Sequence, residues 1–265
     1  MNFELSEEQK MIQQSVERFV QENYDLSDRI KISSENPGYS KDYWNSMAEL
    51  GWLGLAFDEE DGGFGGNQID TLVLMEQFGK GLVLEPFLAN IVLAGGAIKR
   101  GASKALKESI IPKLIEGNLQ LTLAYAEEQS RFDIEDVATA AREDAGNFII
   151  NGKKSMVLNA ESADKVVVVT RTSGSQVDIN GISLFLVDLD SEGIERDNFP
   201  TVDGLRASEI SFKDVEVSAE NLIGEKDKGF SILQEVVNDA ILALSAEAVG
   251  AMEVLYKDTV EYTQQ

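Results

Sequence analysis

The sequence predicts an α+β fold: an all-helical N-terminal domain, a β-rich middle domain and a long final helix. Two changes in the spacing of apolar residues carry this prediction. Spacing is helical up to about residue 118, strand-like up to about 225, and helical again to the end of the chain. We therefore expect parts at 1–118, 119–225 and 226–265. With 265 residues, 43% of them hydrophobic, the chain is long enough to bury a core.

The first part contains several helical segments. Ser6 and Gln9 have the spacing of a capping box, and a single apolar stripe follows them. The glycine-dense stretch DEEDGGFGG at 58–66 lacks the lysine and hydroxyl residue of a P-loop, so we expect a flexible turn between helices. Further helical patterns cover residues 41–50, 68–79, 85–99 and 102–116.

The middle part shows short strand patterns separated by turn residues. Asn151-Gly152 has the composition of a two-residue hairpin turn. The expected strands are 148–158, 165–172, 182–190 and 208–217. Short strands at this spacing favour an antiparallel β-sandwich or barrel. No GxGxxG motif follows a strand here, so a nicotinamide-dinucleotide domain is not predicted.

The last part is a single helical pattern from about 227 to 265. The final residues EYTQQ carry no glycine, proline or basic residue that would mark a helix end. We therefore expect the natural chain to continue beyond this point.

Composition excludes several kinds of chemistry. Without histidine or cysteine, the chain cannot provide a Ser-His-Asp triad, a thiolate nucleophile or a zinc site built on imidazole and thiolate ligands. No acidic loop has EF-hand spacing, so we predict no metal site.

The charge and hydropathy patterns narrow the possible partners. A net charge of −24 repels phosphate backbones and anionic lipids, so neither nucleic acid nor a membrane surface is expected to bind. No apolar run approaches the roughly 20 residues of a membrane span. The N-terminal residues MNFELSEEQK do not resemble a signal peptide, and we expect a cytoplasmic protein.

Five stretches of the chain, in order, resemble the acyl-CoA dehydrogenase family of flavoproteins. They are LSEEQKMIQQSVERFV, ELGWLGLAFDEEDGGFGG, FIINGKKSMVLNAESAD, GLRASEISFKDVEVSAENLIGEKDKGF and AVGAMEVLYKDTVEYTQQ. The resemblance implies FAD as cofactor, an acyl-CoA substrate, electron-transfer flavoprotein as acceptor, and a homo- or hetero-oligomer (dimer or tetramer). It also makes the long helix the start of a C-terminal helical bundle, most of which this chain lacks.

The segment AEEQSRFD aligns with the family's Thr-Glu-Pro-Gly-Ala-Gly-Ser-Asp loop. Ala126 then stands where the family has a threonine that bonds the flavin, and Phe132 where it has a serine near CoA. Backbone groups of Tyr125 and Ala126 remain available to the flavin. Arg131 would meet a phosphate or carboxylate of the substrate, although pairing with a nearby carboxylate of the chain is the favoured interpretation.

The following strand has lost the family's Trp-Ile-Thr. Met156, Val157 and Leu158 occupy those positions. The resemblance makes them cofactor-binding residues, with Met156 packing on the ring in place of tryptophan and the backbone of Leu158 in place of the threonine hydroxyl.

No catalytic residue can be assigned. The family's base is a glutamate, which in most members lies in the C-terminal helical domain and in a minority at the position of Ala240. Ile241 replaces the arginine that usually follows. These two residues are the substrate-binding positions that the resemblance gives on the long helix. Asp239 and Glu247 lie nearby, and we expect Glu247 to pair on the helix surface.

Three interpretations remain. The first is an FAD-dependent enzyme that dehydrogenates an acyl-CoA between its α and β carbons. AEEQSRFD and TVDGLRASE resemble a bacterial subgroup related to the small subunit of pimeloyl-CoA dehydrogenase, which implies fatty acyl, dicarboxylate, aromatic or steroid side-chain esters. The second is a flavin-deficient structural subunit of a heteromeric acyl-CoA dehydrogenase. The third is a stand-alone binding module.

Overall fold

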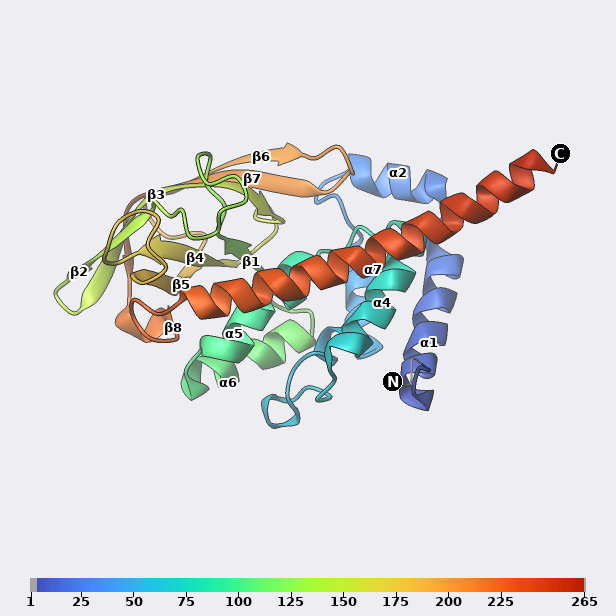
Figure 1. Cartoon of the computed structure of the whole chain (residues 1–265), viewed down its shortest axis with the longest axis horizontal. Coiled ribbons are helices and arrows are strands. Elements are labelled where there is room, and N and C mark those ends of the chain that lie inside the picture. Colours follow the sequence, from blue (N-terminus) through green and yellow to red (C-terminus); the bar gives the residue numbers. More distant parts are fainter. Residues whose placement is uncertain (1–3, 265) are drawn as a thin grey trace.

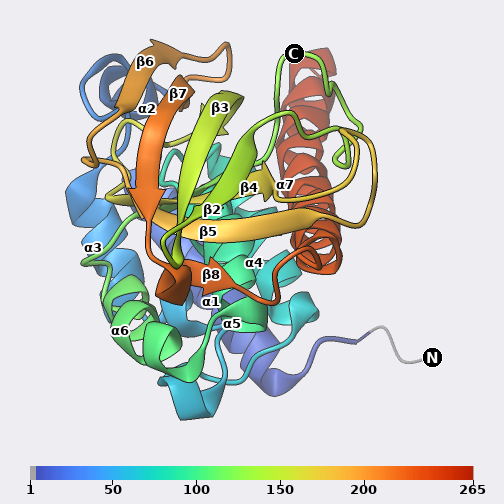
Figure 2. The same ribbon diagram turned by 90° about the vertical axis from the view of Figure 1, so that its left-hand side faces the viewer.

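The computed structural model describes residues 4–264 and shows the predicted order of parts (Figure 1). Helices of the N-terminal domain pack beside one sheet. The last helix starts at the sheet, runs across the N-terminal helices and extends past them (Figure 1). Seen after a quarter turn, strands β6, β7, β3 and β2 lie next to one another, with helix α7 along one side (Figure 2). The predicted α+β class is confirmed.

The N-terminal domain contains six α-helices joined by shorter turns. Ser6 and Gln9 form the predicted capping box, and Asp25 caps a second helix that periodicity alone did not indicate. The helices are α1 (Glu7–Asn23), α2 (Leu26–Ser34), α3 (Lys41–Glu49), α4 (Gln68–Gly81), α5 (Gly96–Gly101) and α6 (Lys104–Ile115), with turns η1 (Trp52–Gly54) and η2 (Glu59–Asp61) and the π-helix η3 (Leu88–Gly95).

The glycine-dense stretch 58–66 is closely folded onto the segment before it. The backbone N–H of Gly65 donates to the carbonyl of Phe57 at 2.8 Å, and that of Gly66 donates to Leu55 at 2.9 Å. A Cβ on Gly63 would stand 2.2 Å from the Phe57 oxygen, so no larger residue fits there. The glycines therefore serve close backbone packing as well as a change of direction.

The middle domain is a mixed sheet. Its strands are β1 (Leu121–Ala124), β2 (Ala140–Asp144), β3 (Asn147–Leu158), β4 (Lys165–Arg171), β5 (Ile182–Asp188), β6 (Ile194–Pro200), β7 (Arg206–Val217) and β8 (Leu222–Ile223). Their order is β6-β7-β3-β2-β4-β5-β8, with β1 beside β4. Most pairs are antiparallel as predicted, but β1 and the start of β2 run parallel to β4. Strand β1 follows a helix and packs on η3, so no hairpin sets its direction.

The predicted hairpin turn at Asn151-Gly152 is wrong. The hairpin between β2 and β3 turns at residues 145–146, and Gly152 lies inside β3 at a shift of register against β7. The Asn151 side chain bonds Asp214 on β7 twice, at 2.9 and 3.0 Å. A Cβ on Gly152 would come within 2.6 Å of Thr139. The glycine is required by a β-bulge and a close strand contact, which the dipeptide alone does not distinguish from a turn.

Helix α7 (Phe230–Thr263) crosses α4 at two glycines. A Cβ on Gly250 would lie 1.8 Å from the carbonyl oxygen of Glu76, and one on Gly79 would lie 1.9 Å from that of Glu247. The two backbones therefore touch directly. This contact fixes the position of α7 along α4 and holds the backbone of Glu247 against the N-terminal domain.

The larger hydrophobic core spans two domains. It joins Leu74 and Ile98 of the helices to Val167 and Leu184 of the sheet. Inside η3, the fully buried Asn90 accepts a hydrogen bond from the Leu121 N–H at 2.8 Å. A second, smaller core fills the other face of the sheet.

Candidate functional site

A buried ion pair joins the segment after β1 to the middle of β3. The Nζ of Lys154 lies 2.7 Å from the Oε1 of Glu127, and these side chains are 0% and 3% exposed. The Glu127 carboxylate also accepts backbone hydrogen bonds from Ala138 at 2.9 Å and Thr139 at 3.0 Å. The pair thereby fixes the position of the segment after β1, in which Ala126 directly precedes Glu127.

Both members of this pair are held in their charged forms. Burial alone would raise the pKa of Glu127, but the charge of Lys154 and the hydrogen bonds lower it to about 2. Burial lowers the pKa of Lys154 to about 8, against the opposing pull of Glu127. The pair therefore stays ionised across neutral pH.

Three of the predicted cofactor residues form one surface beside this pair. Tyr125 and Ala126 are half-buried, and the Ala126 carbonyl accepts a hydrogen bond from the Ser155 N–H at 2.9 Å. Met156 follows at a second register shift of β3, with φ of 52°, and its side chain is 51% exposed. A bulge of this kind turns a side chain out of the normal alternation. The result is an accessible methionine next to a small residue.

The other two predicted cofactor residues face different surroundings. The side chain of Val157 is buried in the smaller core. Leu158 is half-buried, its carbonyl accepts a hydrogen bond from the Thr122 hydroxyl at 2.6 Å, and its side chain lines a cavity. Leu158, two residues after Met156, therefore brings this strand to the wall of the cavity.

The four predicted substrate residues lie in two separate places. Phe132 is 97% exposed and Arg131 is exposed with φ of 48°. Within residues 4–264, Arg131 forms no ion pair, so the expected pairing with a carboxylate is wrong. On α7, Ala240 is buried against the N-terminal domain, whereas Ile241 is 56% exposed. The side chains of these two neighbours therefore point in different directions.

A mostly apolar cavity of about 120 Å³ lies between α4, η3, the start of β7 and α7. We call it the apolar cavity. Its lining residues are Pro37, Gly38, Tyr39, Met75, Phe78, Val83, Leu84, Glu85, Pro86, Phe87, Leu88, Ala89, Leu158, Asn159, Asp203, Leu205, Arg206, Leu244 and Glu247. Four charged side chains interrupt these mostly apolar walls: Glu85, Asp203, Arg206 and Glu247.

Glu85 is a buried carboxyl held by its own domain. It is 5% exposed, accepts the Ser40 N–H at 3.1 Å, and is bonded by the Tyr24 hydroxyl. Burial raises the pKa of Glu85 to about 7, despite the lowering effect of the hydrogen bond from Ser40. Glu85 therefore ties together the segments around α1 and α3 while lining the cavity.

We expect the substitution Glu85→Gln to stabilise the fold at alkaline pH relative to the parent. The native carboxyl keeps a proton that the unfolded chain has already released, so the parent loses stability as pH rises from the unfolded pKa through about 7. The loss approaches about 3 kcal/mol at most. Urea unfolding of both proteins at about pH 5 and about pH 8 measures it. Parallel changes in the two proteins would refute a raised pKa at Glu85.

Glu247 is the second glutamate, and the expectation that it pairs on the helix surface is wrong. It is half-buried, it lines the apolar cavity, and among residues 4–264 no side chain forms an ion pair or hydrogen bond with its carboxyl group. Burial first, and then the charge of Asp203, raise the pKa of Glu247. An unpaired carboxyl against apolar walls is unfavourable unless something else bonds it.

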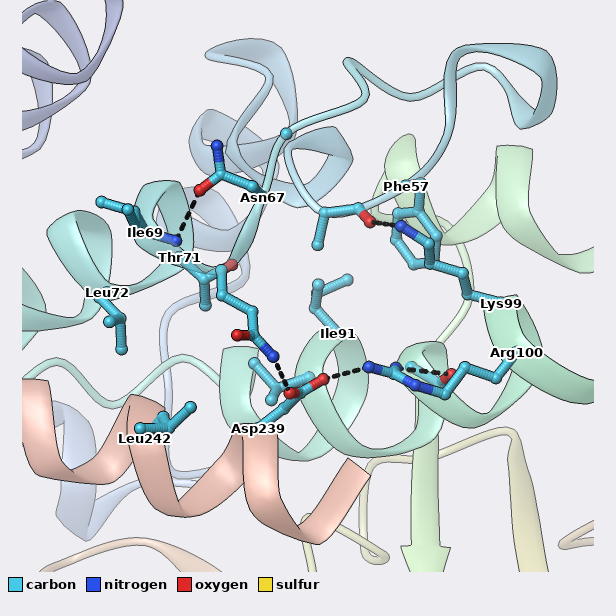
Figure 3. A pocket seen from close by; sticks show the side chains of 15 residues that line it. Phe57, Asn67, Ile69, Thr71, Leu72, Ile91, Lys99, Arg100, Asp239 and Leu242 are labelled. Atoms are coloured by element: carbon cyan, nitrogen blue, oxygen red, sulfur yellow. Dashed lines mark hydrogen bonds and ion pairs between the residues drawn. The ribbon is translucent and has the colours of Figure 1, made fainter. Parts of the chain in front are cut away.

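A larger hollow of about 600 Å³ is lined by residues of α4, η3, α5 and α7 (Figure 3). Its charged side chains are engaged with one another or with the backbone. Arg100 binds Asp239 and also Glu235 at 2.9 Å, and Gln68 bonds Asp239 as well. Lys99 donates to the Ala56 carbonyl at 2.7 Å. The apolar cavity, which connects to Leu158 and contains an unpaired carboxyl, is therefore the better candidate site despite its smaller size.

Sequence reasoning missed three residues of the site. From the sequence, Lys154 would be expected to be an exposed lysine. The register shift on each side of it interrupts the alternation of buried and exposed residues along the strand. Glu85 follows an apolar run, so it reads as a helix start. Glu247 lies seven residues, or two helical turns, after Ala240, and this spacing is the signal that would have placed it on the same face.

Across residues 4–264, no group of three or more acidic residues is arranged to hold a metal ion. The predicted absence of a bilayer-crossing helix holds for the same residues, since none of their helices is long and apolar enough.

Two family models match nearly the whole of the first two domains. The model described as "Acyl-CoA dehydrogenase, N-terminal domain" matches residues 6–118, and "Acyl-CoA dehydrogenase, middle domain" matches residues 122–215. Among curated relatives, mitochondrial isovaleryl-CoA dehydrogenase of Pongo abelii is 28% identical over 97% of this chain and 62% of its own length. The caffeyl-CoA reductase-Etf complex subunit CarC of Acetobacterium woodii is 26% identical over 98% and 69%.

Solved structures agree over the same extent. Butyryl-CoA dehydrogenase from Megasphaera elsdenii superposes with a TM-score of 0.88 at 25% identity, covering 100% of this chain and 71% of that one. An FAD complex of PigA superposes with a TM-score of 0.89 at 26% identity, covering 99% and 70%. The chain thus spans about two thirds of the length of these relatives, and 62% in the isovaleryl-CoA dehydrogenase comparison.

Proposed function

Because the chain belongs to the acyl-CoA dehydrogenase family, we propose that it is part of an FAD-dependent enzyme that removes hydrogen from the α and β carbons of an acyl-CoA thioester. The observation that carries this proposal is the continuity of the apolar cavity with Leu158, next to the accessible surface of Ala126 and Met156. A flat ring against that surface would meet an acyl group lying in the cavity.

The residues beside the cavity fit a flavin ring. Ala126 leaves room for a ring, and the exposed thioether of Met156 packs well on aromatic systems. The Ser155–Ala126 hydrogen bond keeps the two segments at a constant separation. The backbone groups of Tyr125, Ala126 and Leu158 would take the polar edge of the ring. FAD, when bound, supplies the acceptor for the hydride that leaves the β carbon.

The chain's own residues would bind, orient and enclose the substrate. The apolar walls of the cavity would exclude water from the acyl group, which favours hydrogen removal at the α and β carbons over side reactions with water. Phe132 and Arg131 are exposed on the loop that the family uses near CoA, and we propose that they contact the CoA portion. Ala240 is too small to crowd the acyl group, and Ile241, on its exposed side, would contact the remaining part of the enzyme.

A second candidate function is a structural subunit that has lost its own flavin. The absence of side-chain hydroxyls at Ala126 and Leu158 favours it, as does the lack of a carboxylate at Ala240. Electron-transfer flavoprotein as acceptor is supported by CarC, which is named as part of a reductase-Etf complex. Exposed apolar side chains along α7, such as Leu244, Met252 and Leu255, support an oligomer. We also propose a cytoplasmic location.

Flavin content separates the two candidates. The protein purified at its natural length is expected to be yellow, to carry about one FAD per chain, and to lose its visible absorbance when an acyl-CoA is added anaerobically, because hydride reduces the flavin. Absorbance spectra and released FAD measure this. Colourless protein that gains flavin only with a co-expressed related subunit would establish the structural role instead.

A further inference from the structure

We infer that Glu247 makes the apolar cavity select acyl groups that carry a hydrogen-bond donor, a hydroxyl or amino group, at their far end, and reject acyl groups that end in a carboxylate. The inference rests on the proposed function, in which this cavity receives the acyl group. It adds the chemical class of that group, which neither the fold nor the family resemblance specifies.

Within the described part of the chain, Glu247 alone among the carboxyl groups of the cavity wall has no hydrogen-bond or ion-pair partner. Glu85 bonds Ser40 and Tyr24, and the carboxylate of Asp203 accepts a hydrogen bond from the Leu205 N–H at 3.1 Å. For Glu247, no donor of the described residues lies within hydrogen-bond distance of the carboxyl group. A half-buried carboxyl facing apolar walls gains most from a donor that a ligand brings with it.

The charges around Glu247 are mostly negative. The one cation of the lining, Arg206, donates from its Nη2 to the carbonyls of Ser33 at 3.1 Å and Glu35 at 3.2 Å, and its buried Nε has no hydrogen-bond partner among the described residues. Asp203 adds negative charge near Glu247, and Glu85 lines the same cavity. A terminal carboxylate in the substrate would meet the carboxyl groups of Glu247 and Asp203 against the single positive charge of Arg206. A hydroxyl or an ammonium would not be repelled by these carboxyl groups.

Glu247 lies two turns beyond Ala240 on α7, or about 10 Å along the helix axis. The family resemblance places the reacting carbons near the position of Ala240, where a minority of members carry the base. In the proposed function, Glu247 would therefore contact the acyl chain away from the reacting carbons, where a polar substituent would not disturb the chemistry. The touching backbones of Gly79 and Glu247 hold this position constant.

The test uses the holoenzyme at its natural length and four acyl-CoA thioesters of equal chain length, ending in a methyl, hydroxyl, amino or carboxylate group. We expect the parent to favour the hydroxyl or amino ester over the methyl ester by roughly 10- to 100-fold in kcat/KM, the range for a hydrogen bond to a charged group. The carboxylate ester should be the poorest. Comparing the hydroxyl ester with the amino ester shows whether the cavity prefers a neutral hydrogen-bond donor or a cation.

The variants are Glu247→Leu and Glu261→Gln. Leucine removes the carboxyl from the cavity, so Glu247→Leu should reverse the preference in favour of the methyl ester. Glu261→Gln removes one negative charge from an exposed site near the end of the same helix, and should leave the ratio of the four esters unchanged. An unchanged ratio in Glu247→Leu, or a parent that prefers the carboxylate ester, would overturn the inference.

Calorimetric binding of the same four esters separates this inference from the proposed function. Selective binding that depends on Glu247, without flavin reduction, would retain the inference and reject the dehydrogenase activity. Turnover of all four esters without selectivity would retain the dehydrogenase activity and reject the inference about Glu247. If no ester binds, both are wrong.

Discussion

Replacing Lys154 by methionine is expected to lower the free energy of unfolding by about 3–5 kcal/mol, because it leaves the buried carboxylate of Glu127 without its counter-charge. Methionine matches the length of the lysine stem and fills most of its volume. The loss therefore reports the unpaired charge, since lysine is fully buried here and Glu127 nearly so. Urea unfolding at neutral pH measures it.

Two further variants identify the cause. Lys153→Met changes the adjacent lysine, whose pair with Glu209 is half-exposed at 3.2 Å, and should change stability by less than about 1 kcal/mol. The double variant Lys154→Met with Glu127→Gln should recover stability relative to Lys154→Met alone, because neither remaining group is charged. A small loss in Lys154→Met, or no recovery in the double variant, would contradict the described pair.

Gly250→Ala is expected to destabilise the protein by about 3 kcal/mol, because the added methyl would stand 1.8 Å from the Glu76 carbonyl oxygen and must push α7 off α4. In an unobstructed helix the same change would stabilise by about 1 kcal/mol through helix propensity. The sign of the effect is therefore decisive. Thermal or urea unfolding gives the answer.

The control is Ser245→Ala on the same helix. Ser245 is exposed and its hydroxyl bonds only the Ile241 carbonyl of its own helix, so stability should change by about 0.5 kcal/mol or less. Any gain in stability for Gly250→Ala would show that the two backbones do not touch. Because the crossing also holds Glu247, a displaced α7 should weaken the selectivity described above.

Much of the fold could be predicted from apolar spacing, because burial on one face is what that spacing records. The capping box at Ser6 and the long final helix are examples. Helix α2 was missed because it is nine residues long and none of them is fully buried. Leu26 and Ile30 are exposed and only Ile32 packs against the core, so its apolar pattern is too short to detect. The Asn151-Gly152 error has another cause: a bulge and a hairpin turn both favour glycine, and only the partner strand distinguishes them.

The site was harder to predict because its decisive contacts join residues far apart in the chain. Resemblance located Ala126, Met156 and Leu158, and the structure shows how far each is exposed. Nothing local in the sequence indicates that Lys154 would be buried on Glu127, or that Glu247 would lack a partner. Whether a charged side chain is paired and how far it is buried depend on which residues surround it in the folded protein, and these neighbours cannot be identified from the residue's own position in the sequence.

The core shared by the helices and the sheet has a practical consequence for anyone dividing this chain. Family models place a boundary between residues 118 and 122. Separating the chain there would leave Val167 and Leu184 on one piece and Leu74 and Ile98 on the other, each stripped of its covering layer. The family boundary follows the order of the chain, whereas the shared hydrophobic core leads us to expect that the two segments dissolve and unfold as a single unit.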